Sequence, residues 1–334
     1  MIFKQIAILG ANELSISLAL KLKTQRQAPQ VIGYDERNVI VELAQAHGAF
    51  DRIARRPEEA VEGSDLVIVA LPLMAMRESF QAIAPYLKPG AVVTDLVRLK
   101  GPVLAWATEL LPEGTYFIGG HLVFNPILVG PDPMATLEEA SADWLEEALY
   151  CIVPSDAVPE VVLDAFAAWV RDLDAQPYFI DVTEHDGLQA SVEGLPDVLS
   201  VALLRTTVNA PGWPEVRKFA DRRFALATEA AHDAQERHAA VYLNRAQVLH
   251  RVNLLIQELV HIRDLLNRED QAGLADLFTT AANGREQWLA ERAHGLWVQE
   301  SASDMSDVPS LGQQLKRLLL GERPSWQKRQ DEEQ

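Results

Sequence analysis

The chain has 334 residues, of which 48% are hydrophobic, and a formal net charge of −18. This length is enough for two domains that each bury a core, and the composition is typical of a globular protein. The negative charge argues against nucleic acid or an anionic membrane as a partner, because an acidic surface is repelled by both.

The predicted elements of residues 1–182 alternate short β-branched runs with helical patterns. This alternation predicts a parallel sheet with crossover helices, and therefore an α/β domain with a Rossmann-type doubly wound sheet. We expect strands at residues 4–9, 30–34, 65–71, 91–95, 116–119, 149–153 and 178–182. We expect helices at residues 14–23, 39–47, 75–87, 103–111 and 159–173.

From about Thr183 the strand signals stop, and we expect an all-α helical domain over residues 183–320, followed by a flexible tail at 321–334. Apolar residues recur at helical spacing in the clearest pattern: Val248, Val252, Leu255, Leu259, Ile262 and Leu266. Such a seam usually packs inside a bundle, and a subunit interface is the alternative.

Cys151 is the single cysteine and lies in an apolar run, so we expect a small buried hydrophobic side chain. We expect neither a disulfide nor a cysteine-based metal site within one chain, and no metal is predicted. No apolar run is long enough for a membrane span and no signal pattern is visible, which predicts a cytoplasmic protein.

The segment GANELS at residues 10–15 stands where a dinucleotide-binding turn has G-x-G-x-x-G, and only Gly10 of the three glycines is present. Asn12 and Ser15 are compatible with a bound dinucleotide, but Glu13 places negative charge near the helix N-terminus, where phosphate would lie. Two interpretations follow. Either a cofactor binds weakly, or Asn12 caps the helix and Glu13 replaces the phosphate charge.

Further landmarks follow in a fixed order: VIGYDERN (31–38), DLVIVALPL (65–73), VVTDLVRLK (92–100), FIGGHLVFNP (117–126), EHDGLQASVEGLPDVLSVAL (184–203) and GREQWLAER (284–292). This succession resembles the prephenate/arogenate dehydrogenase family, NAD(P)-dependent enzymes of tyrosine biosynthesis, over most of residues 2–292. The resemblance implies a Rossmann domain and a helical domain that forms a homodimer, with the active site in the cleft between them. It also implies oxidative decarboxylation of a small-molecule substrate.

His121 matches the histidine of the family's G-G-H-P motif, which implies that it accepts the proton of the substrate hydroxyl while hydride leaves for the nicotinamide. A histidine without a catalytic role is the alternative. Asp35 fits a carboxylate that binds the ribose 2′-hydroxyl and favours NAD, while Arg37 leaves NADP open. Asp35 could instead cap the following helix. Leu71 and Pro72 complete the expected cofactor site.

The substrate pocket departs from the family pattern. Arg98 stands at the serine of D-x-x-S-x-K, whose lysine is kept as Lys100. Glu193 and Asp197 are the first and last residues of the segment that matches S-H-L-P-H. The two new acids would repel a substrate with two carboxylates unless Arg98 and Lys100 compensate. If the domains close, Arg98 is expected to pair with one of these acids.

Two further parts of the pocket are altered. The terminal arginine of the family's F-R-D-x-T-R is Phe224 here, so Arg222 or Arg223 is the candidate replacement. The loop after His121 also departs from the family pattern, and it contains Asn125.

Three functions therefore stay open: a prephenate or arogenate dehydrogenase, a dehydrogenase with a changed substrate, and a non-catalytic descendant that acts as a binding or regulatory protein.

Overall fold

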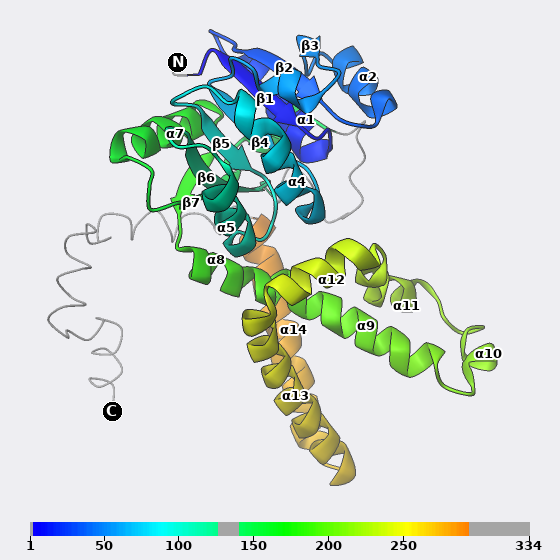
Figure 1. Ribbon diagram of the computed structural model, residues 1–334. Coiled ribbons are helices and arrows are strands. Elements are labelled where there is room, and N and C mark those ends of the chain that lie inside the picture. The colour runs from blue at the N-terminus through cyan, green and yellow to red at the C-terminus, as the bar shows by residue number, and fades with distance from the viewer. Residues whose placement is uncertain (1–2, 126–139, 294–334) are drawn as a thin grey trace, which may run out of the picture. The chain divides into compact units, whose positions relative to one another are not determined.

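The structure is a computed structural model that describes residues 3–125 and 140–293. Met1–Ala281 form one compact unit and Ala282–Gln334 a second. The first unit holds the sheet and most of the helices (Figure 1). The expected division at residue 182 stays a prediction, and the expected tail at 321–334 lies outside the described residues.

An eight-stranded sheet has the order β3-β2-β1-β4-β5-β6-β7-β8. The strands are β1 (Gln5–Leu9), β2 (Gln30–Tyr34), β3 (Arg52–Ile53), β4 (Leu66–Val69), β5 (Val92–Asp95), β6 (Tyr116–Val123), β7 (Leu149–Pro154) and β8 (Gln176–Phe179). In the sheet, β2 and β3 lie on one side of β1, and β4 and the later strands lie on the other side. The strand order therefore reverses between β1 and β4, which is the topological switch point. Ligands of doubly wound sheets bind at such a point.

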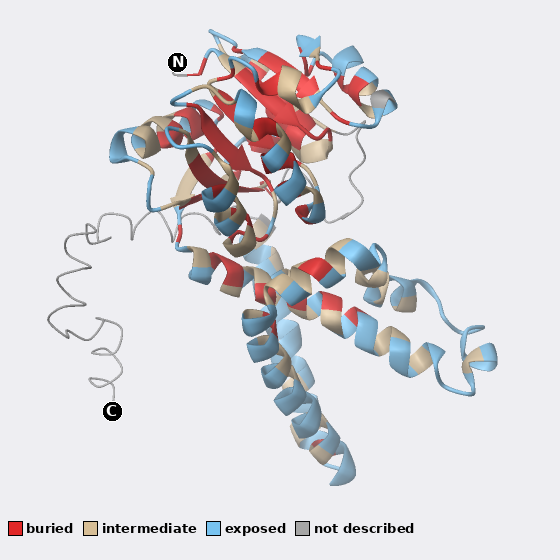
Figure 2. Ribbon diagram, viewed as in Figure 1, coloured by how far each residue is buried: buried red, intermediate tan, exposed pale blue. Residues whose placement is uncertain are grey.

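Helices cover both faces of the sheet. These are α1 (Glu13–Thr24), α2 (Asn38–Ala46), α3 (Pro57–Val61), α4 (Leu73–Ile83), α5 (Gly101–Leu110) and α7 (Glu160–Asp172). Successive residues of β1 point to opposite faces. Ile6 and Ile8 pack in one core with Trp169 of α7, and Ala7 and Leu9 pack in the other with helices α4 and α5. The buried sheet is visible in Figure 2.

The expected doubly wound, parallel sheet is confirmed, with one antiparallel pair, β6 and β7. β6 also continues to Val123, beyond the expected end at residue 119. The reason is the partner strand: β5 pairs with β6 only as far as Ile118, whereas β7 pairs with it from Ile118 to Val123. His121 therefore lies inside a strand.

Only helices follow β8 in the described part of the chain. They are α8 (Val182–Gln189), a π-helical turn η4 (Ala190–Gly194), α9 (Leu195–Val208), α10 (Trp213–Val216), α11 (Arg222–Ala227), α12 (Ala234–Leu243), α13 (Arg245–Asn267) and α14 (Gln271–Ala293). Asp181 caps α8 by accepting hydrogen bonds from the N–H groups of Thr183 and Glu184. None of the described helices is long and apolar enough to cross a membrane.

The described residues cover the seam on α13 only in part. Val248 is buried, but Leu259 is 51% and Leu266 58% exposed. Much of α13 is likewise exposed in Figure 2. Val252, Leu255 and Ile262 are half-buried, so the described residues cover part of the seam and both interpretations stay predictions.

Candidate functional site

The turn after β1 lies at the switch point and requires its glycine. Gly10 has φ +95°, and a Cβ at this position would lie 2.5 Å from the carbonyl oxygen of Ala70. A side chain here would clash with the backbone that follows β4 and would be strained in any case. The one retained glycine of the motif is thus the one that keeps the turns after β1 and β4 in contact.

Asn12 caps helix α1, as one of the two interpretations predicts. Its Oδ1 accepts a hydrogen bond from the Ser15 N–H, and Ser15 Oγ accepts one from the Asn12 N–H, both at 3.0 Å. Asn12 Nδ2 also donates to the carbonyl of Ala70 at 2.9 Å. The backbone of Asn12 is extended, so no left-handed residue is needed here. Among the described residues, the N–H groups of Glu13 and Leu14 have no hydrogen-bond acceptor.

Asp35 is buried at the end of β2 and does not cap α2, whose N-cap is Arg37. One oxygen accepts the N–H of Ala11 at 2.8 Å, and the Arg37 guanidinium binds both oxygens at 2.9 Å. Burial opposes ionisation of this carboxyl, but the hydrogen bonds from Arg37 and Ala11 outweigh it and lower its pKa. The expectation of a helix cap is therefore wrong.

A pocket of about 550 Å³ lies beside this carboxylate at the ends of β1 and β2. It is lined by Leu9, Tyr34, Asp35, Glu36, Arg37, Pro57, Leu71, Pro72, Ala75, Glu78, Ser79 and Ala82. Its apolar walls and its carboxylate suit a nucleoside, which has a flat base and a polar ribose. Of the expected cofactor residues, Asp35, Leu71 and Pro72 line it, and Gly10, Asn12, Glu13 and Ser15 form the adjacent turn.

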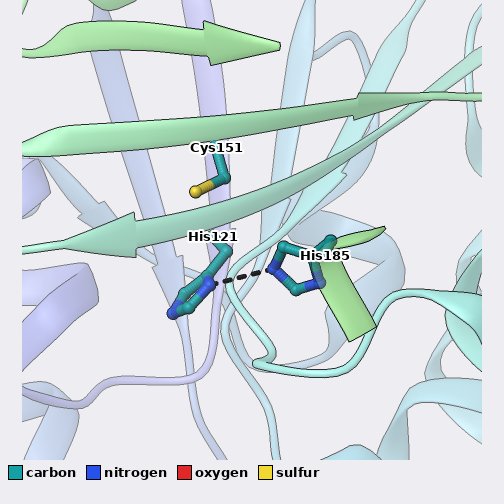
Figure 3. Close-up of side chains that lie close together, drawn as sticks. All are labelled: His121, Cys151 and His185. Carbon is teal, nitrogen blue, oxygen red and sulfur yellow. Dashed lines mark hydrogen bonds between the residues drawn. The ribbon is translucent and has the colours of Figure 1, made fainter. Parts of the chain in front are cut away.

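Two histidines from distant parts of the chain meet at the antiparallel end of the sheet. His121 Nδ1 on β6 lies 3.0 Å from Nε2 of His185 on α8, as Figure 3 shows. His185 Nδ1 lies 2.9 Å from Oδ1 of Asp186. Asp186 also accepts the N–H groups of Lys100 and Gly101 at 2.9 and 2.8 Å, so it is anchored at the start of α5.

This row of hydrogen bonds selects the histidine tautomers. A carboxylate only accepts, so His185 donates from Nδ1, and in the neutral form of His185 its Nε2 accepts. His121 then donates from Nδ1 and keeps a lone pair on Nε2. Burial, followed by the neighbouring His185, Lys100 and Arg98, holds the pKa of His121 well below its ordinary value of 6.5. The imidazole of His121 is therefore neutral near pH 7 and has a nitrogen that can accept a proton.

Lys100 is fully buried beneath the histidines. Its ammonium binds the Asp95 carboxylate and donates to the carbonyl of Gly120 at 2.6 Å. Burial raises the pKa of Asp95 and lowers that of Lys100, because each charged form is desolvated. Lys100 thus joins β5 to β6 and supports His121. It does not line the substrate pocket as expected.

A second pocket, of about 290 Å³, meets the first at Leu71. It is lined by Leu71, Leu73, Leu96, Val97, Arg98, Leu99, Glu193, Asp197, Asp233, Glu236, Arg237 and Ala240. Four carboxylates and two guanidiniums thus face one small space. His121 does not line it and is only 8% exposed, so the described conformation shields the histidine from this pocket.

Ion pairs lie in the second pocket. Arg98 Nη1 lies 2.5 Å from Glu193 Oε1, which confirms that Arg98 pairs with one of the two acids. Asp197 pairs instead with Arg237, at 2.7 Å. Burial raises the pKa of Asp197, and the nearby Glu193 adds to the effect, although Arg237 opposes it. The Arg98 side chain is 61% exposed, whereas that of Asp197 is only 7% exposed, so the second pair is the better shielded.

Glu236 connects α12 to the sheet. Its carboxylate accepts the N–H groups of Leu73 at 2.6 Å and Met74 at 3.4 Å, the first residues of α4. The N-terminus of α4 attracts an anion, because its N–H groups are unpaired within the helix. Glu236 supplies that anion from the chain itself.

Several expected pocket residues lie elsewhere. Arg222 and Arg223 are exposed on α11, where Asp221 caps the helix through the Arg223 N–H, and they do not line the second pocket. Asn125 donates from Nδ2 to the carbonyl of Glu146, so it supports the entry to β7. Arg237 is the guanidinium that faces the pocket in place of Arg222 or Arg223.

Sequence reasoning missed four residues of the site: His185, Asp186, Glu236 and Arg237. The first two belong to EHDGLQ, which the sequence marked only as a landmark. Glu236 and Arg237 lie in no recognised motif.

The position of Gly194 is also informative, because a Cβ there would lie 2.8 Å from Cγ2 of Val248 on α13. A larger residue at this position would displace α13.

These features place the chain among Rossmann-type dehydrogenases that couple a dinucleotide-binding domain to a helical domain. The family model for the prephenate dehydrogenase nucleotide-binding domain matches residues 18–178, and the model for the prephenate dehydrogenase dimerization domain matches residues 181–280. The chain belongs to the prephenate dehydrogenase family. The first match begins after the turn at residues 10–15, so the altered motif lies outside it.

Similar proteins agree with this assignment. Prephenate dehydrogenase of Bacillus subtilis is 23% identical over 329 residues, which cover 96% of this chain and 86% of the relative. Prephenate dehydrogenase of Lactococcus lactis is 25% identical, and the match covers 82% of this chain and 75% of the relative. The prephenate dehydrogenase of A. aeolicus, solved in complex with hydroxyphenyl propionate and NAD+, has the same fold, with a TM-score of 0.72 and 20% sequence identity. The match covers 85% of this chain and 98% of the A. aeolicus chain.

Proposed function

We propose that this chain is an NAD(P)-dependent dehydrogenase of the prephenate/arogenate class, in which His121 accepts the proton of the substrate hydroxyl. The observation that carries the proposal is the row Asp186–His185–His121. With a neutral His185 this row leaves a lone pair on His121 Nε2, and burial lowers the pKa of His121 and so favours the neutral ring. A base must be unprotonated at the working pH, and its orientation must be held by a second group. Both conditions are met here.

The turn after β1 fits a dinucleotide, although less well than an intact glycine motif. The free N–H groups of Glu13 and Leu14 are donors for a pyrophosphate at the start of α1. Against this, the Asn12 side chain bridges to Ala70 across the crevice, and Glu13 adds a negative charge. When bound, the nicotinamide would supply the acceptor for the hydride that leaves the substrate. We therefore propose that binding is retained but weak.

We propose that NAD is preferred over NADP. Asp35 is ionised and faces the nucleoside pocket, where a 2′-phosphate would be repelled. Arg37 is the one opposing feature, since its side chain is 63% exposed and could turn from Asp35 toward a phosphate. Calorimetric titration of Arg37→Ala should show unchanged or tighter NAD binding and weaker NADP binding.

We propose arogenate as a better substrate than prephenate. The two compounds carry the same two carboxylates, but arogenate has an ammonium group where prephenate has a keto oxygen. A pocket with four carboxylates and two guanidiniums repels a plain dianion and offers several partners to an ammonium. An arogenate dehydrogenase from Synechocystis shares the fold, with a TM-score of 0.67 at 19% identity and coverage of 85% of this chain and 99% of that one.

We propose that the ion pair Arg98–Glu193 opens when a substrate binds. Arg98 contributes to the field at His121, and its pair lies at the mouth of the second pocket. Such an exposed pair contributes only about 0–1 kcal/mol, so it opens at little cost. A substrate carboxylate could then pair with the Arg98 guanidinium in place of Glu193. A substrate ammonium could pair with the Glu193 carboxylate in place of Arg98.

We propose that the active form is a homodimer assembled through the helical part. The family model for residues 181–280 is a dimerization domain, and α13 in this region exposes a row of large apolar side chains. These include Leu249, Leu254, Ile256, Leu259, Val260 and Leu266. Burying apolar side chains of this kind is favourable in proportion to their apolar area.

A thermal-shift titration tests the proposed function, because a ligand of the folded state must raise the melting temperature. NAD and NADP should be titrated alone, and prephenate and arogenate in the presence of the better cofactor. The proposal predicts a shift with NAD and a larger shift with arogenate than with prephenate. If neither cofactor shifts the melting temperature at millimolar concentration, the proposed function is wrong.

One observation favours a second candidate, a binding or regulatory protein without catalysis. Glu236 occupies the N-terminus of α4, and Asn12 bridges the crevice between the turns after β1 and β4. Both interactions fill space at the switch point with the chain's own polar groups. A shift with tyrosine or arogenate but with no dinucleotide would support this candidate.

A further inference from the structure

Three side chains with metal-binding atoms meet beside the sheet edge: His121, Cys151 and His185 (Figure 3). One ligand atom from each lies within 4.8 Å of the other two, and all three residues are buried. His121 and Cys151 are directly paired across β6 and β7, so their side chains leave the sheet on the same face. His185 approaches from helix α8.

The donor set suits a zinc-like ion. Imidazole nitrogen and thiolate sulfur are the ligands that Zn²⁺ prefers, at about 2.0–2.1 and 2.3 Å. The two nitrogens that face each other are 3.0 Å apart, so they would separate by roughly 0.3 Å to become neighbouring ligands of a tetrahedral ion. Small side-chain rotations would bring the sulfur within reach. Three protein ligands would leave a fourth position open for water or a substrate oxygen.

The surroundings of the three ligands hold them in place. Asp186 accepts the Nδ1–H of His185 and is itself fixed by the N–H groups of Lys100 and Gly101. A carboxylate behind a ligating histidine orients the ring and raises its basicity. The Cys151 thiolate and the Asp186 carboxylate together balance the charge of a dication. The nearby Lys100 ammonium is neutralised by Asp95.

We propose that His121, Cys151 and His185 bind a zinc-like divalent cation, and that the bound ion blocks His121 as a base. The ion would take Nδ1 of His121, Nε2 of His185 and the sulfur of Cys151. The thiol proton leaves to solvent, and the proton on His121 Nδ1 moves to Nε2, which removes the lone pair that a substrate hydroxyl needs.

Cys151 must ionise to bind the ion. Burial raises its pKa to about 11, although Lys100 opposes the shift. Metal coordination deprotonates a thiol outright, and metal affinity then depends on pH because a proton is released. The affinity should therefore rise with pH.

Cobalt(II) titration of the metal-free full-length protein tests the site directly. The chain has one cysteine, so a thiolate-to-cobalt charge-transfer band can come only from Cys151. The expected result is this band together with visible absorption of tetrahedral intensity, and its loss when Zn²⁺ is added. A wild-type protein without the charge-transfer band would overturn the proposal.

Variants separate the site from adventitious binding. Cys151→Ser should abolish the charge-transfer band. Cys151→Ser and His185→Ala should each weaken Zn²⁺ binding by more than about 100-fold in competition with a chelating dye, because an outer partner alone contributes about 10–100-fold. His261→Ala is the matched control, since His261 is exposed on α13 and should leave affinity unchanged. Cys151→Ala is the second variant if the serine variant does not fold. Equal affinity in wild type and Cys151→Ser would also overturn the proposal.

Discussion

His121 on β6 and His185 on α8 are 64 residues apart in sequence, and their facing ring nitrogens are 3.0 Å apart in the structure. Asp186 continues the row and ends it at the start of α5. The His121 ring thus contacts the helix that leads out of the sheet. Any movement of α8 changes the orientation of the His121 ring.

The low pKa of His121 predicts an acid-sensitive fold. Below its ordinary value of 6.5 the unfolded chain binds a proton at His121 that the folded chain does not, so the free energy of unfolding falls as pH falls from 6.5 toward the folded pKa. This loss reaches up to about 1.4 kcal/mol for each pH unit. Denaturant unfolding at about pH 7.5 and pH 5 should show a smaller loss for His121→Gln than for wild type. His261→Gln should behave like wild type, and an equal loss in all three proteins would contradict the shift.

The two arginine pairs should differ in their contribution to stability. Arg98→Ser should change the free energy of unfolding by at most about 1 kcal/mol, because its pair with Glu193 is largely exposed. Arg237→Gln should cost about 1–3 kcal/mol, because it leaves the buried Asp197 unpaired. Asp197→Asn added to Arg237→Gln should recover part of that loss. Urea unfolding measures all of these values, and a larger cost for Arg98→Ser than for Arg237→Gln would contradict the assignment.

The sequence predicts the sheet well, because buried parallel strands are continuous apolar runs such as Leu66–Val69. It misses β3, which has only two residues, and the extension of β6 through His121, which depends on pairing with β7. The cap at Asn12 is predictable because it is local. The pairing of Arg98 with Glu193 was predictable from a resemblance that brings both residues to one cleft.

The histidine row and the pair Arg237–Asp197 could not be predicted in the same way. Each depends on the rotation of a helix about its own axis and on its distance from the sheet, which no local pattern specifies. The EHD segment contains both His185 and Asp186, but nothing in it indicates that His185 faces β6. The partly exposed seam of α13 shows the converse: helical periodicity predicts an apolar face correctly, but not the partner that covers it.

Removing the charge at Glu13 should strengthen dinucleotide binding. Glu13→Gln takes a carboxylate away from the N-terminus of α1, where a pyrophosphate would lie, and NAD affinity should rise by about 2- to 5-fold at low ionic strength. The double variant Asn12→Gly with Glu13→Gly should bind still more tightly, because it also removes the bridge to Ala70. Glu160→Gln is the control, since Glu160 holds the same first-turn position in α7. Unchanged or weaker NAD binding by calorimetry in both Glu13 variants would show that the pyrophosphate does not approach this turn.

The exposed face of α13 should hold two copies together. Light scattering of the wild type at micromolar concentration should give twice the 37.0 kDa mass of the chain. Leu259→Glu places a charge on this face, where Leu259 is 51% exposed in the single chain, and should shift the protein toward monomer. Glu113→Gln, in a turn on the sheet half, should remain dimeric. A monomeric wild type would contradict the proposed assembly.

The rate of NAD reduction by the purified protein tests the central claim most directly, because it requires that His121 acts as the base. Arogenate and prephenate should each be supplied at saturating concentration, with wild type and His121→Asn compared at the same pH. The account predicts turnover by wild type, with arogenate the better substrate, and a fall in kcat of at least about 100-fold in His121→Asn without a comparable change in NAD affinity. No turnover by wild type with either substrate, or equal turnover by wild type and His121→Asn, would contradict it.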